Sequence, residues 1–549
     1  MSSRSYPTHP PHRRRKKKSR IAPLVSLLAI VAVTGGGLIA LALWWPAARI
    51  DTDAQALVGL TLAPVGETLV SVSVADEHGR HIAVRIRDGK VWPVGKLASG
   101  ERLKIHATVR RASWVGWLVG RTEHVVATVT TPVARVTGTL LHLGPDRPVT
   151  IQFDQPASAV NLKLPGFPTD RLSFAHPQAR IDTGLRASGK NRFGIAEVSV
   201  AARPWEALSA PVRVSWFPAG VRLQAVVKPA PGATIDPTTP ITITFSEPVQ
   251  GVLGLARPTL EPATPGSWKQ TATNVLTFKP SQGYALGQRV TLRLPAPTEV
   301  LAAGRAEMLQ TLSWSVPVGS VARLQQLLAG LGYLPLDWHP AAGATPPTTL
   351  AQTKAAVQPP GGTFTWRYPN TPSELRSLWR PDGWTRMTQG AVMSFEHDHG
   401  LSVDGIAGPL VWHSLISAAM NGDPVAHSYS YVLVHRSVPQ NLTLWNDGTT
   451  IMQVKVNTGV PAAPTPYGTH AVFEHIPVGT MRGRNPDGSR YVDPGIKWIS
   501  YFYGGEAIHG FNRPTYGFPQ SVGCVEAPIA TAGQIWPYTP IGTLVSIVP

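Results

Sequence analysis

The only cysteine among the 549 residues, Cys524, follows His509 by fifteen positions near the C-terminus. Each lies next to a glycine, as His509-Gly510 and Gly523-Cys524. A thiol, an imidazole and backbone amides that glycine leaves accessible are the groups that acyl transfer through a covalent intermediate requires. A lone cysteine is also often a small buried apolar residue. From these residues alone, catalysis and packing explain Cys524 equally well.

Under the catalytic hypothesis, each of these residues has a defined role. A free thiol, with a pKa of about 8.5, is mostly protonated at neutral pH and needs a neighbouring base. We predict that Cys524 is the nucleophile and that His509 is the general base. The backbone N–H groups around Gly523 and Cys524 are the predicted oxyanion donors, because glycine permits the close approach that such donors need.

The composition predicts several domains that are rich in β-structure. The chain contains 51 Gly and 53 Pro, which favours short strands joined by turns over long helices. Hydrophobic residues make up 43% and charged residues 15%, which supplies packed cores and is unlike a disordered chain. At about 150 residues per domain, the length predicts roughly three to five units.

The basic charge is concentrated in the N-terminal tail. Eight Lys and Arg residues and no acid lie within residues 1–20, out of a net charge of +18 for the whole chain. The remainder is only mildly basic, and no nucleic-acid-binding motif accompanies it. The charge therefore argues against a nucleic-acid partner.

Residues 21–45 form an uncharged apolar run that predicts a transmembrane helix. As a helix, these 25 residues would be roughly 37 Å long, enough to cross a bilayer with some tilt. By the positive-inside rule, the basic tail then lies in the cytoplasm and everything after Trp45 lies outside. A cleaved signal peptide is the alternative, although its apolar core is usually shorter. Export also bears on Cys524, because a secreted chain that used disulfides for stability would carry an even number of cysteines.

Residues 50–317 predict repeated β-modules. Two proline-bounded strands with alternating apolar positions lie 92 residues apart, at 148–156 and 240–248. A period near 90 residues is typical of immunoglobulin-sized sandwiches. The third predicted module, with Pro-Gly-Ala-Thr-Ile-Asp-Pro at 231–237 before its strand, resembles bacterial Ig-like domains of envelope proteins. We interpret the modules as a rigid spacer, with ligand binding as the alternative, and place them at residues 50–133, 134–219 and 220–317.

Residues 318–422 predict a helical module. Apolar residues recur at three- and four-residue spacing from Val321, which predicts a helix that starts at Ser320 and ends at Gly332-Tyr333. The helical pattern resumes at residues 390–396 and is expected to continue through Trp412. The motif Phe-x-x-x-x-Gly-Leu-x-x-Asp-Gly-x-x-Gly-Pro at 395–409 resembles the small three-helix peptidoglycan-binding domain. Residues 335–386 are an expected insertion into it.

The same module contains His397-Asp398-His399, which could offer two zinc ligands. No third ligand stands at a recognisable spacing, so a solvated helix end is the preferred interpretation. We predict no metal site and no organic cofactor.

From residue 427 the pattern is again that of β-structure. Strands are expected at 431–435 and 451–456, with an Asp-Gly turn at 447–448 and a glycine-fixed loop at 465–469. This order, closing with His-Gly and Ser-x-Gly-Cys, resembles the L,D-transpeptidase catalytic domain (YkuD-like) over residues 427–549. The resemblance implies the tetrapeptide stem of peptidoglycan as substrate, cut after its third residue with release of D-alanine. The acyl group then passes to the side-chain amine of a diamino acid on a neighbouring stem, which gives a 3-3 cross-link.

The resemblance also implies how the site residues are held. The second ring nitrogen of His509 contacts a backbone carbonyl, which here belongs to Gly510. Further residues near the site are candidates for substrate contacts, with packing as the alternative for each: Tyr467, Trp498, Tyr501, Arg513, Tyr516 and Ser521.

Two positions depart from the family pattern. Val522 stands where the family usually has His, and Glu526 stands where it usually has Arg or Asn. Because His509 matches the family's proton acceptor, the missing second His need not abolish catalysis. Glu526 is expected either to meet the cationic amine of the acceptor or to cap a helix.

The sequence therefore predicts a mainly β, multidomain enzyme anchored in the cell membrane, with its catalytic domain outside and facing the cell wall. Its order is a transmembrane helix, three Ig-like β-sandwiches, a peptidoglycan-binding domain and a C-terminal β-rich transpeptidase domain. The alternatives are a non-catalytic peptidoglycan-binding scaffold with a degenerate site, an L,D-carboxypeptidase, and a ligase that joins a protein to the wall. The oligomeric state stays open.

Overall fold

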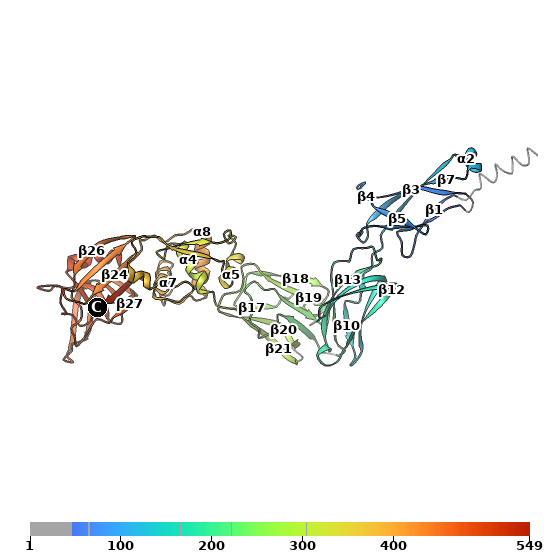
Figure 1. Ribbon diagram of the computed structural model, residues 1–549. Helices are drawn as coiled ribbons and strands as arrows, with labels where there is room; N and C mark the ends of the chain where they lie inside the picture. The colour runs from blue at the N-terminus through green and yellow to red at the C-terminus, as the bar shows by residue number, and fades with distance from the viewer. Residues whose placement is uncertain (1–46, 64–65, 165–166, 221, 303–304) are drawn as a thin grey trace, which may run out of the picture. The chain divides into compact units, whose positions relative to one another are not determined.

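The computed structural model describes residues 47–549 except 64–65, 165–166, 221 and 303–304, and the chain divides into two compact units, Met1–Ala219 and Gly220–Pro549 (Figure 1). The described residues are mainly β-structure, as the sequence predicts. The basic tail at 1–20 and the transmembrane helix expected at 21–45 lie outside the described residues. Within the part that is described, no helix has the length and apolar composition needed to span a membrane.

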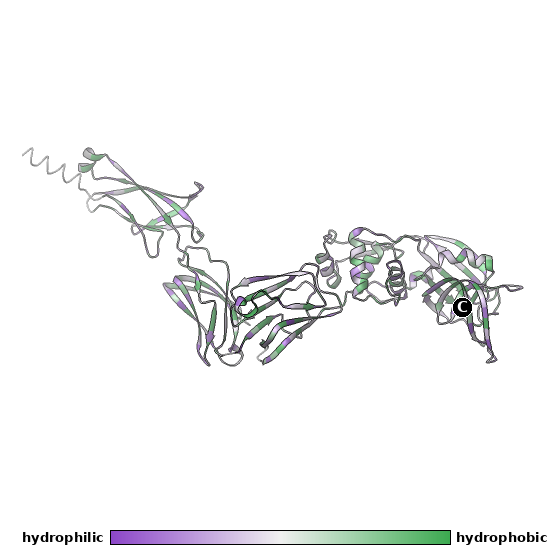
Figure 2. Ribbon diagram, turned by 180° about the vertical axis from the view of Figure 1, so that it is seen from behind, coloured by the Kyte–Doolittle hydropathy of each residue, from purple (hydrophilic) through white to green (hydrophobic). Residues whose placement is uncertain are grey.

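The first unit begins with two four-stranded sheets that enclose one core. In β7, Leu103, Ile105, Ala107 and Val109 are buried while the residues between them face outward, so alternation directs one face of the strand inward. Figure 2 shows this alternation of hydropathy along the strands. One sheet contains β1 (Arg49–Asp51), β2 (Val58–Thr61), β6 (Lys90–Pro93) and β5 (Val84–Arg87). The other contains β4 (His81–Ile82), β3 (Thr68–Asp76), β7 (Arg102–Arg110) and β8 (Thr122–Thr130), and helix α2 (Ser113–Val119) links its last two strands.

The rest of the first unit is a six-stranded sheet built around two long strands. β11 changes its partners along its length, because register shifts between Gln152 and Ala159 divide its pairing with β12. Its first half then pairs with β9 and its second half with β13. The strands are β9 (Val136–Thr137), β10 (Leu140–Leu143), β11 (Pro148–Lys163), β12 (Thr169–Arg186), β13 (Gly194–Ala201) and β14 (Val212–Pro218), with a short turn of helix η1 (Gly189–Asn191).

The second unit begins with a seven-stranded sheet of the same kind. β20 pairs with β21 along its whole length, with β17 in its first half and, in parallel, with β15 in its second half. The repeated strands predicted from the sequence are the first half of β11 and all of β16, so both are confirmed as strands. The Ig-like class of the three modules stays a prediction. The elements here are β15 (Gln224–Lys228), β16 (Ile241–Phe245), α3 (Val249–Leu253), β17 (Thr259–Glu261), β18 (Gly266–Ala272), β19 (Val275–Pro280), β20 (Arg289–Ala302) and β21 (Arg305–Ser315).

Next comes the helical module, whose first helix begins where the sequence predicts. Ser320 accepts a hydrogen bond from the Arg323 N–H at 3.2 Å and so caps α4. The expected continuous helix through Trp412 is wrong, because α7 ends at Asp398 and a turn follows in which Gly400 and Gly405 have positive φ. The insertion at 335–386 carries two strands and two helices of its own. The elements are α4 (Val321–Gly330), β22 (Leu336–Pro340), α5 (Thr349–Val357), β23 (Gly362–Trp366), α6 (Ser373–Ser377), α7 (Arg386–Asp398) and α8 (Pro409–Asn421).

The C-terminal domain packs two sheets on a common core. Val432 and Leu444 from a five-stranded sheet meet Ile508 and Val525 from a four-stranded sheet. The first sheet has the order β26 (Thr449–Lys455), β25 (Asn441–Asn446), β24 (Ser430–His435), β32 (Leu544–Val548) and β27 (Gly468–Ala471). The second has the order β28 (Glu474–Arg484), β29 (Arg490–Tyr503), β30 (Glu506–Gly510) and β31 (Val525–Ala527), followed by α9 (Ile529–Ile535) and η2 (Trp536–Tyr538).

Helix α7 packs directly against the C-terminal domain through two glycines. A Cβ atom on Gly390 would lie 2.6 Å from the carbonyl oxygen of Gly542 and 2.9 Å from a methyl group of Leu544. Both distances are too short for real contacts. The close approach of the two backbones therefore requires glycine at position 390.

We expect Gly390→Ala to destabilise the second unit, although alanine normally favours a helix by about 0.5–1 kcal/mol over glycine. Overpacking against backbone atoms costs about 1–3 kcal/mol and should outweigh that gain. Scanning calorimetry should show a lower midpoint for this unit. The matched control is Gly330→Ala in α4, where a Cβ would meet nothing within 4 Å and which should be neutral or slightly stabilising. Equal effects of the two changes would show that α7 is free to move away.

An ion pair also joins α7 to the segment that enters β24. The Asp398 carboxylate lies 3.4 Å from His427 Nε2 and accepts a hydrogen bond from the Tyr333 hydroxyl at 3.0 Å. The hydrogen bond to Asp398 raises the pKa of His427 above its ordinary value. Burial opposes the change at Asp398, but its bonds with His427 and Tyr333 lower the pKa of that carboxyl.

The pair should stabilise the second unit most between about pH 4 and pH 6.5, where both partners are charged even in the unfolded chain. The His427 contribution is lost as the pH rises through its raised pKa, and the Asp398 contribution is lost as the pH falls through its lowered pKa. We expect Asp398→Asn to flatten the dependence of the calorimetric midpoint on pH between pH 5 and pH 8. An unchanged profile in Asp398→Asn would assign that dependence to other groups.

Candidate active site

Strand pairing brings Cys524 close to His509. β30 and β31 run parallel, with Ile508 opposite Val525 and His509 opposite Glu526. One residue earlier in this register, Cys524 lies beside Ala507, whose N–H donates a hydrogen bond to the thiol. Because side chains alternate along a strand, Ala507 and His509 point to the same face. The thiol and the imidazole therefore face the same side of the sheet.

His509 is buried and held in one orientation. Only 3% of the residue is exposed, and its Nδ1 lies 3.3 Å from the carbonyl oxygen of Gly510. Since that oxygen can only accept, Nδ1 carries the proton and Nε2 is left as a proton acceptor. Burial lowers the pKa of His509 below its ordinary value, although the Gly510 carbonyl opposes this. The imidazole is thus neutral at neutral pH, and its basic nitrogen has no hydrogen-bond partner among the described residues.

The half-buried Cys524 lies against an apolar cluster. Cys524 packs against a small cluster of hydrophobic residues made of Met481, Ile496, Ile499 and Ala507, together with the rings of Tyr491 and Tyr501. Burial raises the pKa of the Cys524 thiol to about 12, the Ala507 N–H opposes the rise, and the charges of Glu526 and Glu506 add to it. A neutral thiol therefore meets a neutral imidazole, and its proton must leave as the sulfur attacks.

The loop before Cys524 is fixed by its own hydrogen bonds. Gly523 has φ +111°, a conformation that residues with a Cβ rarely adopt. The buried Ser521 hydroxyl donates to the carbonyl oxygen of Cys524 at 2.6 Å, and the Ser521 N–H donates to Thr458 at 3.1 Å. Ser521, a candidate for substrate contact, thus uses its polar groups within the protein and holds the loop in place.

Glu526 forms a two-point ion pair with Arg513. Both carboxylate oxygens lie 2.8 Å from guanidinium nitrogens of Arg513, and the carboxylate is buried. Arg513 also donates to the carbonyl of Gln520 at 3.2 Å and stacks over the ring of Phe511. The expectation that Glu526 caps a helix is therefore wrong, since it lies within β31. Its contact with the acceptor amine stays a prediction, and its carboxylate is already paired with Arg513.

The aromatic candidates divide between the site and the rest of the domain. Tyr501 lies beside the thiol, and its burial and the neighbouring Cys524 raise its pKa. Trp498 is not brought to the thiol, because it packs against Gly533 of α9 and its ring lies tilted against that of Trp536, with 5.5 Å between the ring centroids. The Tyr516 hydroxyl accepts from the Arg513 N–H and donates to Phe511, which closes the loop after β30. Tyr467 is exposed under the guanidinium of Arg436.

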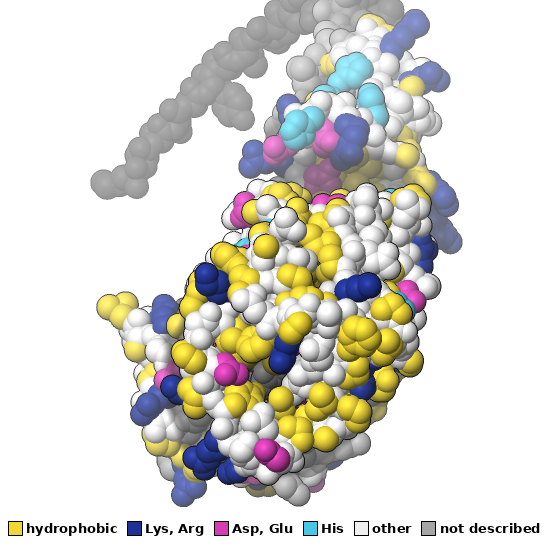
Figure 3. Space-filling view, turned by 90° about the vertical axis from the view of Figure 1, so that its left-hand side faces the viewer, with side chains coloured by type: hydrophobic (Ala, Val, Ile, Leu, Met, Phe, Trp, Pro, Cys, Tyr) yellow, Lys and Arg dark blue, Asp and Glu magenta, His cyan; other side chains and the backbone are white. Residues whose placement is uncertain are grey.

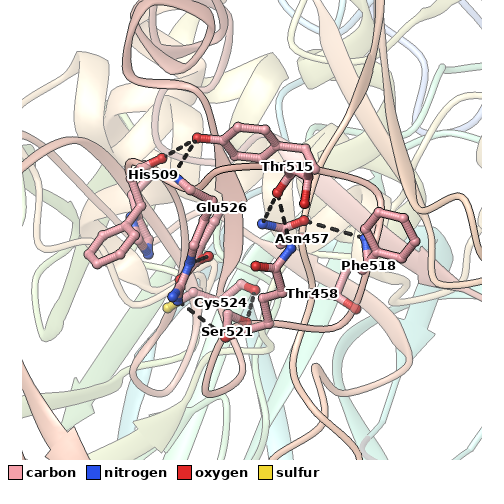
Figure 4. A network of polar contacts seen from close by, with 12 residues as sticks. Asn457, Thr458, His509, Thr515, Phe518, Ser521, Cys524 and Glu526 are labelled. Atoms are coloured by element: carbon pink, nitrogen blue, oxygen red, sulfur yellow. Dashed lines mark hydrogen bonds and ion pairs between the residues drawn. The ribbon is translucent and has the colours of Figure 1, made fainter.

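A buried polar segment that the sequence reasoning missed supports the loop from the other side. Asn457 exchanges two backbone hydrogen bonds of 2.9 Å with Glu526, and its side-chain oxygen accepts from the Gly517 N–H at 3.1 Å. The Thr458 N–H donates to the buried side chain of Gln440 at 2.8 Å. Figure 4 shows Asn457 and Thr458 next to Ser521 and Cys524. The available signal was the polar Asn-Thr-Gly that directly follows an alternating strand.

The surface of the domain combines apolar and charged side chains. Large apolar residues are exposed on it, among them Val478, Val492, Tyr503 and Phe518. Figure 3 shows hydrophobic patches between separate basic and acidic side chains on the face of the C-terminal domain that is turned toward the viewer. Such a surface offers apolar contacts and charged partners to a peptide.

Comparison with known families identifies this domain. Residues 429–547 match the family model of the L,D-transpeptidase catalytic domain, YkuD. These residues are an L,D-transpeptidase catalytic domain. The predicted resemblance of the C-terminal part is therefore confirmed. The family match ends there and does not extend to the modules before residue 429.

Solved structures of L,D-transpeptidases are also similar to the chain. The NMR structure of the catalytic domain from E. faecium L,D-transpeptidase has 24% identity and a TM-score of 0.21, covering 23% of this chain and all of that one. An L,D-transpeptidase from Mycobacterium smegmatis has 12% identity and a TM-score of 0.20, covering 60% of this chain and all of that one. L,D-transpeptidase 3 from Mycobacterium tuberculosis has 12% identity and a TM-score of 0.21, covering 59% of this chain and 97% of that one. A search of the curated proteins found no match.

Within the L,D-transpeptidase domain, the positive charge next to the cysteine strand comes from an unexpected position. The family resemblance places an Arg or Asn two residues after the cysteine, where this chain has Glu526. Arg513, in the loop after β30, supplies the guanidinium instead. The charge pair next to the cysteine strand therefore has its carboxylate on β31 and its guanidinium on the loop after β30. No group of three metal-ligating side chains occurs among the residues that the structure describes.

Proposed function

We propose that this chain is a cysteine-dependent transpeptidase that joins peptidoglycan stems by 3-3 cross-links. The observation that carries the proposal is the position of the buried His509 on β30, next to β31, the strand that follows Cys524 directly. The Gly510 carbonyl holds Nδ1 of His509, and Nε2 has no hydrogen-bond partner among the described residues. This pairing supplies a nucleophile and an oriented base next to each other.

The first half-reaction forms a thioester. His509 Nε2 takes the thiol proton as the sulfur of Cys524 attacks the carbonyl after the third residue of a tetrapeptide stem. Backbone N–H groups around Gly523 and Cys524 stabilise the oxyanion of the tetrahedral intermediate. The C–N bond then breaks, and the imidazolium gives its proton to the amine of the departing D-alanine.

The second half-reaction transfers the acyl group. The side-chain amine of a diamino acid on a neighbouring stem attacks the thioester carbonyl, and the C–S bond breaks. His509 passes a proton from the nitrogen to the sulfur, which restores the neutral pair. Water in place of the amine would give a tripeptide, and a protein amine would give a wall-linked protein.

Product analysis tests this proposal against its alternatives. The purified protein is incubated with disaccharide-tetrapeptide, and the products are separated and weighed by mass spectrometry. We expect a 3-3 linked dimer and free D-alanine. A tripeptide alone would indicate an L,D-carboxypeptidase, and a protein-linked fragment would indicate a ligase. Wall binding without any product would indicate a scaffold with a degenerate site.

We also propose that residues 21–45 anchor the enzyme in the cell membrane and that residues 318–422 bind peptidoglycan near the catalytic domain. The charge distribution of residues 1–45 supports the anchor. Cell fractionation with mass analysis of the N-terminus tests it: retention in the membrane with an intact N-terminus is expected, and a new N-terminus after residue 45 would indicate a cleaved signal peptide. Pelleting of the protein with purified walls tests the binding module. The amount that pellets should be unchanged in Cys524→Ala.

A further inference from the structure

A second carboxylate lies beside the thiol, and no residue in the described part of the chain pairs with it. Glu506 begins β30, directly after the Gly504-Gly505 turn that connects it to β29. Its carboxylate packs over Gly523, where a Cβ atom would lie 3.2 Å from Oε1. The same residue separates Gly505, whose carbonyl oxygen lies 3.9 Å from the Cys524 sulfur, from Ala507, which donates to that sulfur. Glu506 therefore borders the nucleophile directly.

The two carboxylates near the thiol differ in their partners. Glu526 is buried and fully paired with Arg513. The Glu506 carboxylate is only partly buried, and within the described residues it accepts no hydrogen bond and meets no cation. It is thus the free negative charge next to the sulfur.

This charge disfavours formation of the thiolate, since the carboxylate adds to the raised pKa of Cys524. A group that opposes the chemistry of the resting enzyme becomes useful if a cation joins it during the reaction. The second substrate of the proposed reaction carries such a cation, because its nucleophile is the side-chain amine of a diamino acid.

We propose that Glu506 binds the side-chain ammonium of the acyl acceptor and thereby selects diamino-acid stems over water. The inference rests on the proposed transpeptidase function. The carboxylate holds the nitrogen near the thioester, one proton leaves to solvent, and the free amine forms the C–N bond. A second proton passes through His509 to the sulfur as the C–S bond breaks.

The test separates acylation from transfer in Glu506→Gln. The enzyme is acylated with tetrapeptide donor, and the acyl-enzyme is then offered either an ammonium-bearing stem or hydroxylamine, a nucleophile that is uncharged at neutral pH. We expect the KM for the ammonium acceptor to rise about tenfold to a hundredfold, which is the value of a charge-assisted hydrogen bond. Glu506→Gln should use hydroxylamine about as well as the wild type does. Acylation of Glu506→Gln should be at least as fast as that of the wild type, because removing the carboxylate favours the thiolate.

Two further variants complete the design. Glu474→Gln, in the exposed first position of β28, removes the same charge two strands away from β30 in the same sheet and should change neither step. Glu506→Asp keeps the charge and should retain most of the selectivity. Equal selectivity of Glu506→Gln and the wild type for ammonium over hydroxylamine would overturn the inference, as would a loss of acylation in Glu506→Gln. If the wild type itself is never acylated, the proposed function fails instead.

Discussion

Replacement of Cys524 by alanine should abolish cross-link formation, and replacement of His509 by glutamine should slow acylation about a hundredfold to ten-thousandfold. The first change removes the atom that bears the acyl group, and the second removes the base that takes its proton. Glutamine keeps much of the volume and polarity of the buried imidazole, so it isolates proton transfer from packing. Acylation is followed by mass spectrometry over time after mixing with a tetrapeptide donor.

The matched control for His509→Gln is His475→Gln. His475 is also partly buried in the same domain, but it stacks on Trp536 on the α9 side. His475→Gln should leave acylation unchanged. Equal losses in both variants would indicate that the His509 effect is structural.

The titration of the site should differ from that of an ordinary thiol and imidazole. The base is active only when neutral, and burial lowers the pKa of His509. Acylation should therefore stay near its maximum at pH 6.5 and fall only at lower pH. Because burial raises the pKa of Cys524 to about 12, its alkylation by iodoacetamide should still be increasing at pH 9. A thiol that titrates near pH 8.5 would instead indicate an open, non-catalytic site.

Removing Arg513 should destabilise the transpeptidase domain by about 3–5 kcal/mol, because it leaves the buried carboxylate of Glu526 without its partner. Arg513→Met keeps the apolar stem that packs on Phe511 and removes only the charged end. The double variant Arg513→Met/Glu526→Met removes both charges and should recover most of the lost stability, since a buried pair is often no better than two apolar residues.

Denaturant unfolding of the three proteins measures these differences. The control is Arg482→Met, an exposed arginine of β28, which should change the free energy of unfolding by less than about 0.5 kcal/mol. If the single and double variants are equally unstable, the role of Arg513 lies in its bonds to the loop backbone and not in compensating Glu526.

The reactive pair was predictable because its signal is local. An unpaired cysteine, a histidine at a short spacing and glycines next to both are visible in the letters of the sequence. The start of α4 was also predictable, because Ser320 precedes a regular apolar spacing. The family match then confirmed the class of the C-terminal domain that the order of strands and loops had indicated.

The remaining features depend on contacts between distant segments. Glu526 pairs with a residue thirteen positions away, and nothing in either segment specifies the other. Trp498 belongs to the strand that leads to the site, but its side chain points to α9. The helix expected to reach Trp412 stops at Asp398, because the glycines of the motif adopt left-handed backbone conformations there. Burial of Asn457 and the free charge of Glu506 likewise appear only once the sheets are assembled.

The most direct test of this account is the mass of the protein after incubation with a carbapenem or a tetrapeptide muropeptide, followed by peptide mapping. We predict a stoichiometric adduct on the peptide that contains Cys524, and none in Cys524→Ala. An adduct that persists in Cys524→Ala, or a wild-type protein that never forms one, would contradict the assignment of Cys524 as the nucleophile.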